Sequence, residues 1–150
     1  MNSTSCEALH LDNQLCFALY STSLAMNKLY KPLLAKLGLT YPQYLMMLVL
    51  WEEDGITSTA VGKRLHQDLG ALSPVLKRLD AQGLLERRRS SDDERKVLLF
   101  LTPAGKALQQ QAQSLPHSVL CASGLNIEQV VSLKQQLDSL RLTLNGDGHG

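Results

Sequence analysis

The stretch LLERRRSSDDERKVLLFLT, residues 84–102, decides the fold of this chain of 150 residues. Leucines open the stretch, a run of valine, leucine and phenylalanine closes it, and a polar tip crowded with arginine lies between them. Two apolar ends around a polar tip predict a two-stranded hairpin. A hairpin with a basic tip is suited to contact phosphate groups, and we call it the wing.

Two short helices are predicted immediately before the wing. The first is capped by Thr57 or Ser58. The second begins between residues 69 and 72, because Pro74 fits only near the start of a helix. Two helices followed by a wing form a winged helix-turn-helix, which we assign to residues 57–102.

The second of these helices has one apolar face and an opposite face that is small, polar and basic. Leucine and valine recur at i, i+3, i+4 and i+7 from Leu72, which predicts the buried face. The outward face carries Ser73, Pro74 and Lys77. We expect Ser73 and Lys77 to face base edges and phosphates in a major groove.

The charges of the chain are unevenly distributed. The net charge is only +1, but residues 62–106 carry ten Lys or Arg and six Asp or Glu, a net charge of +4. A local basic surface is what binding by counterion release requires. Arg87, Arg95 and Lys96 supply positive charge on the wing, and Arg95 is suited to a minor groove. We expect Asp93 to orient Arg95 through a charge-assisted hydrogen bond.

A run of arginines alone is more often a solvated strand edge than a binding site. Here two helices with a basic outer face precede the run. The combination predicts binding to double-stranded DNA.

Two further helices are predicted before the DNA-binding unit. Asp12 caps the first, whose apolar stripe includes Cys16, and Pro32 should end or kink it near Tyr30. A capping box at residues 40–43 starts the second, which runs to about residue 53. Because this second helix is apolar on nearly every side, it should lie in the middle of the core.

Helices are also predicted after the wing. Thr102 and Pro103 match an N-cap followed by proline at the first helical position, and Pro116 should perturb the helix that they open. Asn126 caps the last helix. Apolar residues spaced 3, 4, 3, 4 along it form a seam for packing against another helix: Val130, Leu133, Leu137, Leu140 and Leu144.

The order of these elements resembles that of the MarR family of bacterial transcription regulators. The wing pattern of that family, D-x-R-x5-L-T, is matched from Asp93 to Thr102. Residues 11–20, 28–33 and 37–44 are similar to the organic-hydroperoxide-sensing OhrR repressors within that family. The resemblance implies a homodimeric repressor, not an enzyme, that binds a pseudo-palindromic operator with its recognition helices about 34 to 36 Å apart.

The same resemblance assigns a redox role to four residues. In the OhrR branch an N-terminal cysteine reacts with an organic hydroperoxide, two tyrosines hydrogen-bond it, and in some members a second cysteine joins it in an intersubunit disulfide. These roles fall on Cys16, Tyr30, Tyr41 and Cys121. The thiolate is the reactive form, and a place near the start of a helix favours an anion. Oxidation through a sulfenic acid to a disulfide should then release the operator.

Together these observations predict a single domain over residues 1–150, mainly α-helical with a small β-wing. Dimerisation helices at residues 11–37 and 103–145 flank the winged helix-turn-helix. The longest apolar stretch is far shorter than the roughly 20 residues of a membrane-spanning helix, and no signal peptide is expected. We therefore expect a cytoplasmic protein with no membrane partner. The cysteines and histidines share no ligand spacing, so we expect no metal and no cofactor.

Three other functions fit parts of the same sequence. A regulator of this fold would instead bind a small aromatic ligand, with Cys16 as an inert, small hydrophobic residue. A thiol peroxidase would turn over peroxide, although no activating arginine stands near Cys16 in the sequence. An interaction module without DNA affinity is the third.

Overall fold

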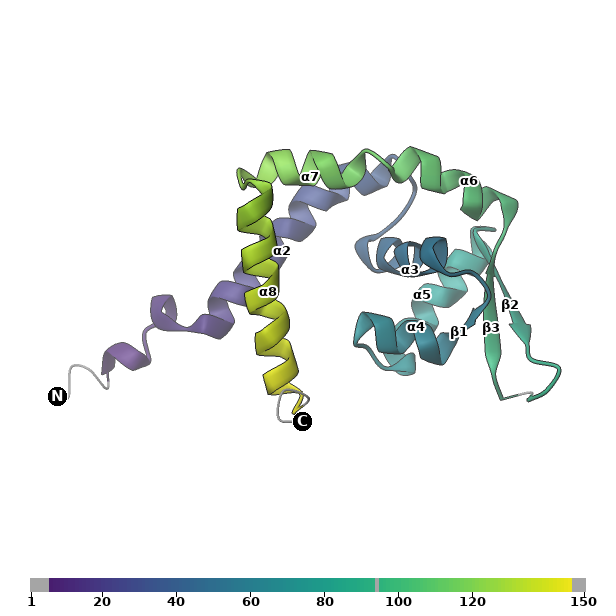
Figure 1. Cartoon of the computed structure of the whole chain (residues 1–150), viewed down its shortest axis with the longest axis horizontal. Coiled ribbons are helices and arrows are strands. Elements are labelled where there is room, and N and C mark those ends of the chain that lie inside the picture. The colour runs from purple at the N-terminus through teal and green to yellow at the C-terminus, as the bar shows by residue number, and fades with distance from the viewer. Residues whose placement is uncertain (1–5, 94, 147–150) are drawn as a thin grey trace. The chain divides into compact units, whose positions relative to one another are not determined.

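The computed structural model describes residues 6–93 and 95–146 (Figure 1). The chain divides into two compact units, Met1–Gln113 and Ser114–Gly150. Within the described residues, no helix is both long enough and apolar enough to cross a membrane.

Most of the chain is helical, with one small sheet, which confirms the predicted fold class. The elements of the first unit are, in order, η1 (Leu11–Asn13), α2 (Leu15–Ala35), α3 (Tyr41–Glu52), β1 (Ile56–Thr57), α4 (Ser58–Leu65), α5 (Leu69–Ala81), β2 (Leu85–Arg89), β3 (Val97–Leu101) and α6 (Pro103–Ala112). Those of the second unit are α7 (Leu115–Ser123) and α8 (Ile127–Leu144).

Helix α3 lies at the centre of the first unit, where α2, α4, α5, α6 and β3 all contact it. The predicted capping box is present, because the Thr40 N–H donates to Gln43 Oε1 at 2.9 Å and the Gln43 N–H donates to Thr40 Oγ1 at 3.4 Å. The buried apolar side chains of α3 are Tyr44, Met46, Met47, Val49 and Leu50. Removal of these side chains from water is a large part of what stabilises the unit.

Gln43 is the one buried polar side chain among the described residues, with 4 % of its surface exposed. Its Nε2 donates to Gln82 Oε1 at 2.7 Å, and Gln82 Nε2 donates to the Gly38 carbonyl at 2.9 Å. These hydrogen bonds offset the cost of burying an amide. Gln82 is the residue that follows α5, so the network joins the start of α3 to the end of α5.

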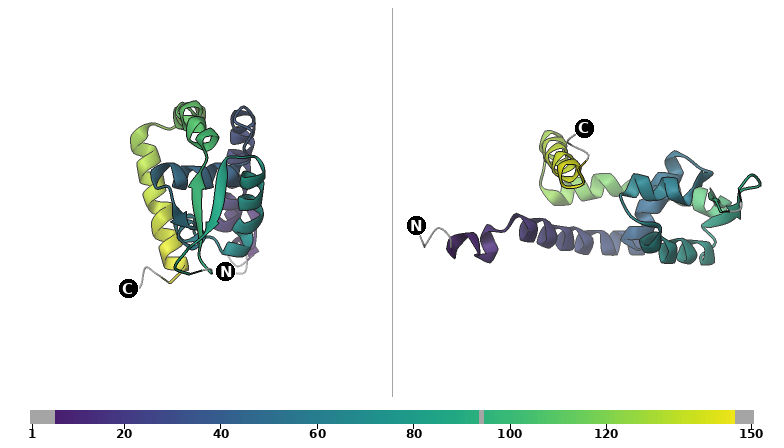
Figure 2. Two further views of the ribbon diagram at one scale, coloured as in Figure 1. Left: turned by 90° about the vertical axis from the view of Figure 1, so that its right-hand side faces the viewer. Right: turned by 90° about the horizontal axis from the view of Figure 1, so that it is seen from below.

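The three strands form an antiparallel sheet in the order β1-β3-β2 (Figure 1). The two longer strands lie side by side in Figure 2. Strands β2 and β3 are the predicted wing, with Leu85 opposite Leu101 and Arg89 opposite Val97. The sequence gives no signal for β1, because two residues are too few to show an alternating pattern. This strand pairs Ile56 with Leu99 and so attaches the wing to the start of α4.

The arginines that we expected at the tip of the wing lie in strand β2 instead. Residues 87–89 pair with residues 97–99 of β3, so pairing with an apolar neighbour overrides their own weak preference for strands. The loop of the wing begins at Ser90, whose N–H donates to the Lys96 carbonyl at 2.9 Å. The bases in this loop are therefore Arg95 and Lys96.

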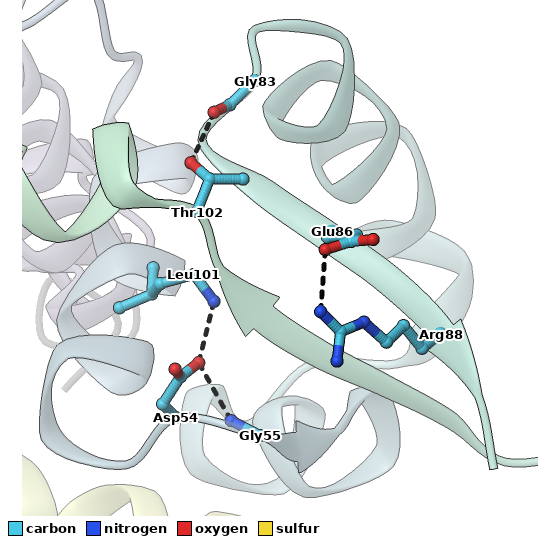
Figure 3. Close-up of polar contacts among 7 residues, drawn as sticks. All are labelled: Asp54, Gly55, Gly83, Glu86, Arg88, Leu101 and Thr102. Atoms are coloured by element: carbon cyan, nitrogen blue, oxygen red, sulfur yellow. Dashed lines mark hydrogen bonds and ion pairs between the residues drawn. The ribbon is translucent and has the colours of Figure 1, made fainter. Parts of the chain in front are cut away.

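Side-chain hydrogen bonds hold the base of the wing (Figure 3). Asp54 Oδ1 accepts from the Leu101 N–H at 2.8 Å and from the Gly55 N–H at 3.0 Å. Thr102 Oγ1 donates to the Gly83 carbonyl at 2.5 Å. The last two residues of the D-x-R-x5-L-T pattern thus attach β3 to the end of α3 and to the turn after α5.

The predicted N-cap of α2 is wrong, and so is the first of the two effects predicted for Pro32, an end of the helix near Tyr30. Asp12 lies in η1, and Gln14 is the N-cap of α2. The Gln14 side chain donates to carbonyls of the preceding turn, which holds the chain in that turn before the helix begins. Pro32 does not end the helix at Tyr30, because α2 continues to Ala35. Pro32 lies in the last turn, where its missing N–H removes one backbone hydrogen bond close to the end of the helix.

The other predicted helix starts are confirmed. Thr57, Thr102 and Asn126 each accept a hydrogen bond from the backbone N–H three residues later. The region of Pro116 is perturbed as expected, because α6 ends at Ala112 and α7 begins as a separate helix.

The long helices α2 and α8 leave many apolar side chains exposed. Leu34 is the one buried residue of α2, and none of the residues of α8 is buried. The exposed apolar side chains include Leu15, Phe17, Leu19, Leu24 and Met26 on α2, and Val131, Leu133, Leu137 and Leu142 on α8.

At Gly105, helix α6 packs closely against the residue that precedes β2. A Cβ atom at this position would collide with the Leu84 carbonyl oxygen. The Gly105 carbonyl also accepts from Trp51 Nε1 at 3.0 Å, so α6 cannot move away without losing that bond. We expect Gly105→Ala to lower the free energy of unfolding by about 2 kcal/mol or more, measured by urea denaturation.

Gly70→Ala is the matched control for this substitution, because Gly70 also lies in a helix and has nothing within 4 Å of a Cβ atom. Alanine at this position should raise stability by about 0.5 to 1 kcal/mol. Equal effects of the two substitutions would contradict the close approach at Gly105.

Candidate nucleic-acid interface and cysteine sites

The outer face of α5 is exposed, as its sequence predicts. Ser73, Pro74 and Lys77 lie on that face, whereas Leu72 and Leu76 are buried on the other. The helix therefore packs its apolar side on the core and presents its polar side to solvent.

Asp93 organises the wing tip. Its Oδ1 accepts from the backbone N–H of Arg95 at 3.0 Å and from Arg95 Nε at 3.2 Å. The backbone N–H and then the side chain of Arg95 hold the pKa of the Asp93 carboxyl below its ordinary value. The Arg95 side chain is 92 % exposed, so the turn holds a guanidinium group outward in solvent. The hydrogen bond between Arg95 and Asp93 is the one predicted from the sequence.

The arginines in β2 contact acids of their own chain. Arg87 Nε donates to Asp80 Oδ2 at 2.8 Å, which joins the wing to the last turn of α5. Arg88 pairs with Glu86 at 3.0 Å (Figure 3) and lies 4.4 Å from the centre of the Phe100 ring. Both pairs are exposed and add little stability, but they fix where the arginine side chains lie.

Sequence reasoning missed the two acids in these pairs. The contact between Glu86 and Arg88 was recoverable, because residues i and i+2 of a strand share a face. Asp80 and Arg87 belong to different elements, and only their packing brings them together. Together with Val97 and the neighbouring arginines they line a hollow of about 300 Å³ beside the wing.

Cys16 is the second residue of α2 and is exposed, so in the single chain it is not the buried hydrophobic residue of the alternative interpretation. Tyr30 follows on the same unbroken helix, fourteen residues later. At 1.5 Å per residue, about 21 Å separates the two Cα atoms. The Tyr41 ring lies 4.9 Å from that of Tyr30, at the same end of α2 and not at the end that holds the thiol. One chain alone therefore does not bring Cys16 together with either tyrosine.

Tyr30 and Tyr41 form a cluster with Tyr44 where α2 meets α3. Ring centres are 5.9 Å apart for Tyr30 and Tyr44 and 6.4 Å apart for Tyr41 and Tyr44. Burial raises the pKa of Tyr30 to about 12, and it also raises the pKa values of Tyr41 and Tyr44. Their hydroxyl groups are therefore protonated donors at neutral pH. Beside Tyr41 is a groove of about 450 Å³ that Lys31 and Pro42 also line.

Cys121 lies in the last turn of α7, in the second unit. It is exposed, and its Sγ lies 3.5 Å from His117 Nε2, one turn earlier on the same helix. Cys6 is also an exposed free thiol. The described residues contain no group of three or more His, Cys, Asp or Glu that could hold a metal ion.

Comparison with known proteins places these features in a family. The family model of the transcriptional regulator SarA/Rot matches residues 28–112. The chain is 47 % identical over 137 residues to the organic hydroperoxide resistance transcriptional regulator of Bacillus subtilis. That alignment covers 91 % of this chain and 93 % of the relative.

Solved structures give the same result. Reduced AbfR bound to DNA matches with a TM-score of 0.76 and 34 % identity, covering 93 % of this chain and 96 % of that one. AbfR is a protein of Staphylococcus epidermidis, and other structures describe it as overoxidised and bound to DNA or as disulfide formed. A mutant of Escherichia coli MarR, in complex with operator DNA, matches with a TM-score of 0.75 and 27 % identity over 84 % of this chain and 92 % of that one.

These relatives are transcriptional regulators and not enzymes. A family model that spans the helix-turn-helix and wing, and a relative that is nearly half identical along most of the chain, agree with the fold. The chain belongs to the MarR family of winged-helix, DNA-binding transcriptional regulators.

Proposed function

We propose that the chain is a dimeric repressor that senses organic hydroperoxides by oxidation of Cys16 and then releases its operator. The observation that carries this proposal is the exposed thiol in the first turn of α2, in a chain so similar to a regulator of organic hydroperoxide resistance. Helix N-termini favour anions, and the thiolate is the form of cysteine that attacks peroxides.

DNA contact is proposed for the exposed face of α5 and for the wing. Ser73, Pro74 and Lys77 would lie in the major groove, and Arg95 with Lys96 would reach an adjacent minor groove. Arg87 bonds to Asp80 through Nε, and a phosphate would meet its terminal nitrogens.

Dimerisation is supported by the apolar side chains that α2 and α8 leave exposed. Exposed apolar side chains gathered on a helix often mark a protein–protein interface, and burial between two copies would remove them from water. A twofold dimer would also place two recognition helices on the two halves of a pseudo-palindromic operator.

The sensing site is proposed to form between subunits. Because α2 holds Cys16 and Tyr30 about 21 Å apart, the hydroxyl groups that stabilise the thiolate must come from the other copy of the chain. The raised pKa values of Tyr30 and Tyr41 keep those hydroxyls protonated, so they can donate to an anion. An antiparallel pairing of two α2 helices would bring each thiol to the partner's tyrosine cluster.

In the proposed reaction the Cys16 thiolate attacks one peroxide oxygen of the hydroperoxide. A sulfur–oxygen bond forms, the oxygen–oxygen bond breaks, and the products are a sulfenic acid and, after protonation, an alcohol. Cys121 of the other subunit then displaces the sulfenic oxygen to give a disulfide and water. Breaking the tyrosine hydrogen bonds would disturb Tyr41, next to the capping box whose Gln43 is bonded to Gln82 at the end of α5.

Loss of Arg95 should weaken DNA binding mainly through phosphate contacts. For Arg95→Ala we expect the slope of log affinity against log salt concentration to fall by about 1. Fluorescence anisotropy on a duplex selected by the wild-type protein from a random pool measures the slope. Asp93→Asn should weaken binding less than Arg95→Ala, because Arg95 keeps its positive charge and loses only the carboxylate that orients it. Lys134→Ala, on exposed α8, is the control, and equal slopes for Arg95→Ala and this control would exclude a wing contact.

Oxidation should release the same duplex in a gel-shift experiment. We expect one equivalent of cumene hydroperoxide to abolish the shifted band of wild-type protein and to leave that of Cys16→Ser unchanged. Mass spectrometry should find the modification at Cys16 before any other thiol. A Cys16→Ser protein that still releases its DNA would overturn the sensor proposal.

A mixed dimer tests whether the tyrosines act across subunits. Tyr30→Phe should slow Cys16 oxidation about tenfold in the homodimer, because a hydrogen bond to a charged group is lost. In a dimer of one Tyr30→Phe chain and one Cys16→Ser chain, Cys16 remains only in the first chain and Tyr30 only in the second. The Cys16 thiol then meets the intact Tyr30 of its partner. Its oxidation should then proceed at the wild-type rate, whereas a slow rate would place thiol and tyrosine in the same chain.

One observation favours a second candidate function, a regulator that binds a small aromatic ligand. The groove beside Tyr41 offers aromatic and cationic side chains, the latter from Lys31. This alternative predicts no selective change at Cys16 after one equivalent of organic hydroperoxide, which mass spectrometry of the treated protein determines.

A further inference from the structure

We propose that His117 accepts the proton of the Cys121 thiol and thereby enables Cys121 to attack oxidised Cys16. This inference rests on the proposed function and adds to it a third participating residue, for the step in which the disulfide forms.

The first support is the contact between the two side chains. His117 precedes Cys121 by four residues on α7, and i and i+4 side chains share one face of a helix. His117 Nε2 lies 3.5 Å from Cys121 Sγ, within hydrogen-bond range for sulfur. Both side chains are exposed, so the pair is open to a reacting sulfur. Of the three cysteines, all of which are described, Cys121 is the one whose sulfur contacts an imidazole.

The second support is the position of the two thiols on their helices. Cys16 lies in the first turn of α2, where free N–H groups favour an anion. Cys121 lies in the last turn of α7, at the negative end of the helix dipole, which opposes an anion. The first thiol is therefore suited to attack a hydroperoxide as a thiolate. A base beside the second thiol would take its proton and raise the fraction of thiolate that can attack.

The reaction balances with His117 as the carrier of one proton. The Cys121 proton moves to His117 Nε2, and Cys121 Sγ forms a bond to Cys16 Sγ while the sulfur–oxygen bond of the sulfenic acid breaks. The proton from His117 joins the leaving hydroxide, which departs as water. The sulfur of Cys121 is oxidised and the sulfenic sulfur is reduced, so the only oxidant is the hydroperoxide consumed in the first step.

The first experiment isolates the pair from peroxide chemistry. In a chain carrying Cys6→Ser and Cys16→Ser, Cys121 is the remaining thiol, and its rate of alkylation by iodoacetamide is measured at pH 7. His117→Ala should slow this rate on the order of tenfold, less than the 100-fold or more of a buried general base. Free imidazole should restore the rate. Ser118→Ala, on the same helix, is the control and should leave the rate unchanged.

The second experiment follows both steps in a chain that carries Cys6→Ser only. After one equivalent of cumene hydroperoxide, dimedone labelling reports sulfenic acid at Cys16, and non-reducing gels report the disulfide. His117→Ala should leave the rate of sulfenic acid formation unchanged and slow disulfide formation about tenfold, so that labelled Cys16 accumulates. Free imidazole should reverse this effect, which a purely structural role of His117 does not predict.

The outcomes separate the two proposals. Wild-type rates of alkylation and of disulfide formation in His117→Ala would overturn the role of His117, and so would slow rates that imidazole does not restore. If no sulfenic acid forms at Cys16 even with His117 present, the proposed sensing function fails. The alkylation experiment then still decides whether His117 activates Cys121.

Discussion

The architecture of the first unit depends on a helix with no polar face. Because α3 is apolar on nearly every side, it is stable only when other elements cover it, and α2, α4, α5, α6 and β3 do so. Hydrogen bonds at the two ends of α3 then fix where α5 and the wing lie. Gln43 bonds to the residue after α5, and Asp54, just beyond the end of α3, bonds to the wing. Hydrogen bonds therefore attach both α5 and the wing to residues at the ends of the same buried helix.

The candidate DNA surface is organised before DNA arrives. Arg87 is bonded to Asp80, Arg88 to Glu86 and Arg95 to Asp93. Each acid reduces the attraction for phosphate, but it also holds a long, flexible side chain in one place. Less side-chain entropy is lost when such a residue meets its partner. The acids therefore weaken the non-specific attraction of the arginines for phosphate and give the arginines a defined geometry. A defined geometry favours discrimination between DNA sites.

Local signals in the sequence were sufficient for most of the fold. Capping at Thr40, Thr57, Thr102 and Asn126 depends on residues three apart in the chain, and a periodic apolar pattern identified α5. Features that failed depend on distant neighbours. Strand β1 exists because β3 pairs with it. The approach of Tyr30 to Tyr41 and of Arg87 to Asp80 likewise follows from packing alone.

The unbroken α2 also limits how this protein can change over evolutionary time. Insertion of a single residue between Cys16 and Tyr30 would rotate the thiol about the helix axis by about 100° and displace it by about 1.5 Å relative to the tyrosines. Substitution of an exposed side chain in this segment has no such effect. In the proposed dimer the length of this segment is therefore constrained more tightly than its composition, because it sets the distance between each thiol and the tyrosines of the same chain.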